Sequence, residues 1–177
     1  MKRVWRLVVL SLGVGVCSTS ALAESGKAVI QATLPNNKGF PVSGTAALND
    51  TPEGLAVSVQ VANVPPGQHG LHIHEFGECA DAGKAAGGHF NPANTPHGFL
   101  PKDGVGKAHA GDMGNIDIGP DGSGALTVTL SGVTLSSGPH SVAGRAIILH
   151  EKVDDFGQPT GNAGGRIGCG VIQITGQ

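Results

Sequence analysis

The chain has 177 residues, a length typical of one domain with a single hydrophobic core. Glycine supplies 30 of these residues, more than twice its usual share of about 7%, and aromatic residues only 3%. This composition favours a turn-rich β protein and disfavours a helical bundle. Hydrophobic residues still reach 39%, which is enough for a folded core and argues against an intrinsically disordered chain.

The first 23 residues have the pattern of a secretory signal peptide. Three cationic residues precede an apolar run at 7–16, and a small-x-small site ends at Ala23. A membrane-spanning helix would need about 20 apolar residues, and the polar residues here leave too few. Lipoprotein processing at Cys17 is a further alternative, although bulky Val16 stands where such sites have a small residue. We therefore predict a signal peptide at 1–23 and a single domain at 24–177, with no membrane segment after cleavage.

Cleavage would leave eight cationic residues against 13 acidic ones, a formal net charge of −5, and no tryptophan or tyrosine. A chain without a basic cluster or stacking aromatics has no obvious surface for nucleic acid, so that class is set aside. Two cysteines would remain, Cys79 and Cys169. In an oxidising compartment an isolated pair predicts a disulfide, the alternative being two buried free thiols.

Short segments that alternate or are rich in β-branched residues predict eight strands separated by turn signals. In chain order they are Ala28–Leu34, Val42–Leu48, Leu55–Asn63, His69–His74, Met113–Ile118, Gly124–Leu130, Arg145–His150 and Gly170–Thr175. Such strands predict an all-β antiparallel sandwich or barrel. Two long segments, Glu75–Gly111 and Glu151–Gly168, interrupt the spacing, and we interpret them as functional loops.

Histidines gather in one part of the chain. Seven of the eight fall between His69 and His140. Side chains alternate along a strand, so His72 and His74 share one face, about 7 Å apart, where both imidazoles can reach one metal ion. Three loop histidines and one carboxylate, a donor set that zinc accepts, follow: His89, His97, His109 and Asp112.

Several motifs carry a family resemblance that spans nearly the whole mature chain. They are Gly70–Gly77 (GLHIHEFG), Gly88–Pro92 (GHFNP), His97-Gly98, His109–Asn115 (HAGDMGN), His150–Lys152 (HEK) and Gly161–Gly170 (GNAGGRIGCG). In this order they resemble copper,zinc superoxide dismutase. The resemblance implies an eight-stranded antiparallel Greek-key barrel with two long functional loops, which agrees with the predicted strands.

The resemblance also implies two metal ions per subunit. Copper would be held by His72, His74, His89 and His150, and zinc by His89, His97, His109 and Asp112, with His89 bridging both. Copper(II) favours a tetragonal set of imidazoles, and zinc tolerates a tetrahedral set that includes oxygen, so each ligand set suits its ion.

Four further residues take roles by resemblance. Asp154 would link a copper-site histidine to a zinc-site histidine and fix their tautomers, the alternative being an ordinary loop acid. Cys79 and Cys169 would form the family disulfide. Arg166 would face the copper channel, where the glycines around it allow close approach. His69, out of phase with His72 on its strand, is expected to bond backbone within the fold, and His140 to be a loop or surface residue.

The implied function is the dismutation of superoxide to oxygen and hydrogen peroxide by a redox-cycling copper ion beside a structural zinc ion, with Arg166 and His89 as catalytic residues. The second loop is shorter than in the better-known members of the family, and the resemblance is closer to exported bacterial members, which predicts a periplasmic location. The resemblance is compatible with a homodimer but supplies no subunit surface. Two other classes stay open: a noncatalytic metal-binding protein of the same fold, and a zinc hydrolase, which would need an open three-ligand zinc site.

Overall fold

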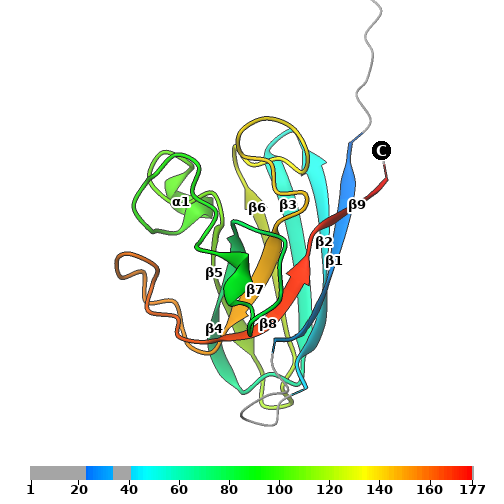
Figure 1. Ribbon diagram of the computed structural model, residues 1–177, viewed down its shortest axis with the longest axis vertical. Helices are drawn as coiled ribbons and strands as arrows, with labels where there is room; N and C mark the ends of the chain where they lie inside the picture. Colours follow the sequence, from blue (N-terminus) through cyan, green and yellow to red (C-terminus); the bar gives the residue numbers. More distant parts are fainter. Residues whose placement is uncertain (1–22, 34–40, 177) are drawn as a thin grey trace, which may run out of the picture.

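The computed structural model describes residues 23–33 and 41–176 (Figure 1). Residues 1–22 of the predicted signal peptide, and Leu34 at the end of the first predicted strand, lie outside the described residues. The strands are β1 (Ser25–Ala32), β2 (Ser43–Thr51), β3 (Gly54–Ala62), β4 (Gly67–His74), β5 (Asp112–Ile118), β6 (Gly124–Leu130), β7 (Ala146–His150), β8 (Arg166–Val171) and β9 (Gln173–Gly176).

Eight of these strands form a closed antiparallel barrel. The order in the sheet is β2-β3-β6-β5-β4-β7-β8-β1, and pairing of β1 with β2 closes the ring, while β9 adds to β1 as an extra strand. The order departs from the chain order where β6 pairs with β3 and β7 with β4, as in a Greek key. The predicted all-β fold with an eight-stranded antiparallel barrel is therefore confirmed.

The barrel interior is filled by alternate residues of each strand. On β3, residues Leu55, Val57, Val59 and Val61 are buried, and the residues between them are more exposed. β4 and β7 differ, because their outward faces are also buried. On β7, Ile147 and Leu149 belong to the core, whereas Ala146 and Ile148 join a smaller cluster with Ala86, Cys169 and Cys79. This part of the barrel wall is thus covered from outside.

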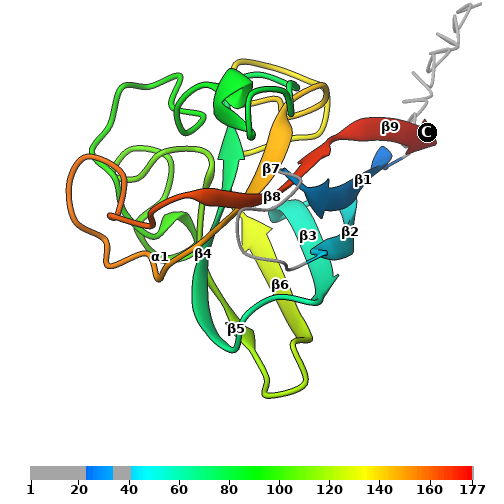
Figure 2. The ribbon, with the colours of Figure 1, turned by 60° about the horizontal axis from the view of Figure 1, so that its bottom comes forward.

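Two long loops provide that cover. The first, between β4 and β5, contains a 3₁₀ turn η1 (Lys84–Ala86) and a short helix α1 (Leu100–Asp103). The second joins β7 to β8. Both lie on the side of the barrel away from β9 (Figure 2). A disulfide between Cys79 and Cys169 ties the first loop to β8, which confirms the predicted pairing. No helix in the described part of the chain is long and apolar enough to span a membrane.

The strand predictions hold best where alternation is clear. Gly124–Leu130 coincides with β6, and the other ranges differ by a few residues at their ends. The prediction of one strand at Gly170–Thr175 is wrong: β8 begins at Arg166, and β9 is a separate strand. The strand is interrupted between them at Ile172, which forms backbone hydrogen bonds with Arg145 and Gly144. The second loop accordingly ends before Arg166 rather than at Gly168.

Candidate metal centre

The adjacent strands β5, β4 and β7 present most of the predicted ligands on the covered face of the barrel. Leu71 and Ile73 point into the core, so His72 and His74 point outward, beneath the loops. β4 pairs with β7, at the end of which stands His150. His89 comes from the first loop and makes an isolated antiparallel bridge to His74. All seven predicted ligands are buried, none more than 6% exposed.

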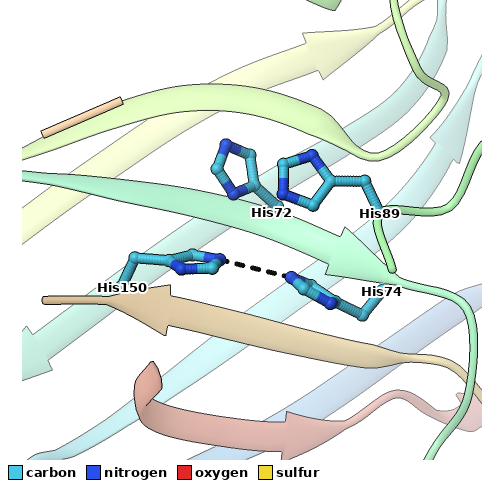
Figure 3. A group of neighbouring side chains, drawn as sticks. All are labelled: His72, His74, His89 and His150. Carbon is cyan, nitrogen blue, oxygen red and sulfur yellow. Dashed lines mark hydrogen bonds between the residues drawn. The ribbon is translucent and has the colours of Figure 1, made fainter. Parts of the chain in front are cut away.

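The first group of donors is made of four imidazoles, His72, His74, His89 and His150, each with a nitrogen within 4.8 Å of the others (Figure 3). His74 Nδ1 lies 3.0 Å from the carbonyl of Gly87, to which it donates, which leaves its Nε2 without a proton. That atom faces His150 Nε2 at 3.2 Å. Converging imidazole nitrogens suit a cation that accepts their lone pairs, and four imidazoles suit copper.

The second group contains His89, His97, His109 and Asp112. The Asp112 carboxylate lies at its centre: Oδ1 is 2.9 Å from His89 Nδ1 and 3.2 Å from His109 Nδ1. Oδ2 accepts backbone N–H groups of Gly98 and His109, which fixes the carboxylate. Three imidazoles and one oxygen form the closed four-ligand set of a structural zinc site.

His89 belongs to both groups. Its Nδ1 approaches Asp112 of the second group, so its Nε2 is the nitrogen left for the first. The ring centroid of His89 lies 3.9 Å from that of His72 and 5.2 Å from that of His97, one ligand of each group. The His89 imidazole therefore offers Nε2 to the first group and Nδ1 to the second.

Asp154 connects the two groups on their far side. Its Oδ2 lies 2.8 Å from His72 Nε2, and its Oδ1 lies 2.9 Å from His97 Nε2. Gly161, at φ +74°, passes so close that a Cβ there would overlap the carboxylate. The ionised carboxylate can only accept, so both Nε2 atoms carry a proton, and in the neutral imidazoles both Nδ1 atoms keep a lone pair.

Those two Nδ1 atoms test the fit of the metal ions. In the described part of the chain, His72 Nδ1 and His97 Nδ1 are the buried side-chain polar atoms without a hydrogen-bond partner. His97 Nδ1 lies 2.9 Å from Asp112 Oδ2 without hydrogen-bond geometry. A buried lone pair without a donor costs free energy, and a bound cation removes that cost. The residues therefore fit copper in the first group and zinc in the second.

The electrostatics of the two groups differ. Burial, followed by the neighbouring histidines, lowers the pKa of His150 to about 2 and lowers that of His74 as well. Burial also lowers the pKa of His89 to about 4, against the effect of Asp112. At His97 burial alone would lower the pKa, but Asp112 and Asp154 interact favourably with the protonated ring and raise the pKa to about 9. At pH 7 the first group is thus neutral, whereas in the second, without a metal ion, the positive charge of protonated His97 offsets the negative charge of Asp112.

Arg166 lies at the start of β8, within the electrostatic reach of His74 and His150. Its guanidinium donates to the carbonyls of Gly83 and Gly87 in the first loop, at 2.5 and 2.6 Å. These two bonds hold the side chain beside the first group. Because the cation is paired only with neutral carbonyls in these contacts, its charge is not cancelled there by a carboxylate.

Sequence reasoning placed the two remaining histidines as the structure has them and missed two amides. His69 is 4% exposed, and its nitrogens bond the carbonyls of Pro65 and His150. His140 lies in the loop after β6, bonded to a backbone carbonyl. The two missed amides are Asn115, which bonds Asp154, and Gln158, which bonds His97. Asn115 ends the motif His109–Asn115, whereas no spacing signal marks Gln158.

The fold and the two ligand groups define a β-barrel protein with a paired metal centre. Residues 42–172 match the family model described as copper/zinc superoxide dismutase (SODC). The chain belongs to the copper/zinc superoxide dismutase family and is an oxidoreductase. It is also similar to the crystal structure of the clock protein EA4, with 34% identity and a TM-score of 0.73, over 85% of this chain and 94% of that one.

Proposed function

We propose that the protein dismutates superoxide to oxygen and hydrogen peroxide through a redox cycle, with Arg166 and His89 as catalytic residues. The observation that carries this proposal is the sharing of His89 between an all-imidazole group and a group with a carboxylate. Such a pairing places a metal suited to electron transfer next to one suited to holding structure. A zinc hydrolase is disfavoured because the second group offers four ligands rather than three.

Copper, when bound by the first group, supplies one-electron oxidation and reduction of superoxide. The chain itself supplies binding, orientation and proton handling. Arg166 attracts the anionic substrate to the first group, because its guanidinium is held by two neutral carbonyls and keeps its full charge. His89, with Nδ1 beside Asp112, can take up and return a proton at Nε2. Asp154 keeps the proton of His72 on Nε2, so that Nδ1 stays available.

The same proposal includes export to the bacterial periplasm. The signal at 1–23 would be removed, and 24–177 would act as one mature domain. The disulfide supports an oxidising compartment. The intact mass of the protein recovered from the periplasm should correspond to a chain beginning at Glu24, and any other start contradicts the cleavage site. A homodimer belongs to this proposal, and the native mass of the purified protein tests it.

Metal content per chain, measured together with superoxide consumption, tests the activity. The wild type should hold one copper and one zinc ion and consume superoxide. His89→Ala should disturb both metals and abolish most activity, whereas His140→Ala, which changes a histidine outside both groups, should leave them unchanged. A fully loaded wild type without activity would refute the proposed function, and normal copper and zinc binding by His89→Ala would refute the bridge.

A further inference from the structure

The side chain of Gln158, in the second loop, forms a pair of hydrogen bonds with the backbone of His97 in the first. The N–H of His97 donates to Gln158 Oε1 at 3.0 Å, and Gln158 Nε2 donates to the carbonyl of His97 at 2.8 Å. His97 lies outside every helix and strand. One side-chain amide therefore satisfies both of its backbone polar groups, as a neighbouring strand would.

The same short segment holds His97 from two more directions. Asp154 accepts from its Nε2, and the ring of Phe156 lies nearly parallel to the imidazole, with 20° between the planes and 6.3 Å between the centroids. Asp154 thus contacts the edge of the His97 ring, Phe156 faces the ring, and Gln158 bonds the His97 backbone. The Nδ1 atom that faces Asp112 is left for the metal.

The segment is itself fixed to the barrel. On β5, Asn115 Nδ2 donates to the carbonyl of Asp154 at 2.9 Å, and the N–H of Asp154 donates to Asn115 Oδ1 at 2.7 Å. This is the same two-bond arrangement that Gln158 makes with His97. His97 is therefore tied through the second loop to a strand, although the first loop that carries it has no strand pairing at this point.

We propose that Gln158 is a positioning residue of the zinc site, which retains the ion by clamping the ligand His97 against movement. The proposal rests on the assignment of zinc to the second group. Release of the ion requires His97 to move away from it, and movement of the His97 backbone breaks both hydrogen bonds to Gln158. Two neutral hydrogen bonds of ordinary strength correspond to roughly a tenfold change in the release rate.

The experiment compares zinc release from fully loaded proteins into a chromogenic chelator. Gln158→Ala removes both bonds, and Gln158→Glu keeps the acceptor and loses the donor. Gln158 is exposed, so its truncation leaves no core cavity. The matched control is Gln68→Ala. Gln68 is an exposed glutamine on β4 that donates to Asp117 on β5 at 2.9 Å. Hydrogen exchange of the His97 amide is followed in the same samples.

Gln158→Ala should release zinc roughly tenfold faster than the wild type and Gln158→Glu roughly threefold faster, with faster exchange at the His97 amide in Gln158→Ala, while Gln68→Ala should match the wild type. Equal release rates for wild type and Gln158→Ala would overturn the proposal. So would acceleration of the same size in Gln68→Ala, because it would indicate general destabilisation. A wild type that binds copper but retains no zinc would instead contradict the assignment of the second group, and the proposal with it.

Discussion

Replacing Asp154 by asparagine changes one atom and tests how the two metal sites are linked. The carboxylate accepts a hydrogen bond from His72 Nε2 at 2.8 Å and another from His97 Nε2 at 2.9 Å. Hydrogen bonds from these two histidines hold its pKa below the usual range despite burial, so it is ionised at pH 7. An asparagine of the same shape has one oxygen and one NH₂ group, so only one of the two positions held by Oδ1 and Oδ2 still accepts hydrogen bonds.

The other histidine then faces an N–H donor. It can accept a hydrogen bond from that donor only if its own proton moves from Nε2 to Nδ1, the atom needed for the metal. Otherwise its Nε2–H and the asparagine N–H are two donors in contact. A hydrogen bond to a charged group contributes about 1.5 to 3 kcal/mol. Asp154→Asn should therefore weaken the binding of one metal by roughly 10- to 100-fold, and that of the other much less.

Competition titrations with copper and with zinc measure the two affinities separately. The control is Asp155→Asn, because within the described residues the neighbouring exposed carboxylate bonds Gly157 and Asn162 and belongs to neither metal group. If Asp154→Asn kept both affinities within about twofold of the wild type, the tautomer argument would be refuted. Equal weakening by Asp155→Asn would show instead a nonspecific effect of lost charge.

Three more outcomes follow from the same contacts. Arg166→Ala should lose roughly 10- to 100-fold in catalytic efficiency and show a weaker salt dependence, and Arg166→Glu should lose more; equal stopped-flow rates for wild type and Arg166→Glu at full copper loading would exclude this role. Replacing Cys79 and Cys169 by serine should cost about 2 to 5 kcal/mol of stability, and an unchanged melting temperature would contradict it. In metal-free protein the low pKa values of His89 and His150 mean that the unfolded state binds more protons below pH 6.5. Stability should fall from that pH toward pH 4, and urea titrations showing a flat profile would oppose this.

Strands whose residues alternate could be predicted from the sequence, whereas the start of the glycine-containing strand β8 was predicted wrongly. β6 (Gly124–Leu130) alternates cleanly and was predicted to the residue. β8 contains Gly168 and Gly170, which a pattern of side chains cannot recognise as strand. At Gly170 a Cβ would lie 2.6 Å from the carbonyl of Val29, so the glycine allows β1 and β8 to pack closely. The feature that hides the strand from sequence reasoning is required by its packing.

The metal ligands could be predicted because imidazole and carboxylate types are rare in such spacings, and the resemblance assigned them to two ions. Gln158 could not, since a glutamine in a polar loop carries no signal of its own. Its role depends on the path of the second loop, which brings residue 158 beside His97, 61 residues earlier. Only the folded arrangement makes that contact visible.

Closure of the barrel fixes the relative positions of the copper ligands. His72 lies opposite Ile148, and His74 opposite Ala146, in the pairing of β4 with β7. In an open sheet a strand can slip by two residues and keep the same face inward. In a ring, each slip must be matched by every other strand before the last can meet the first. The relative positions of the copper ligands thus depend on the register of all eight strands. A substitution on the opposite wall, near β2, can therefore change the copper site without contacting it.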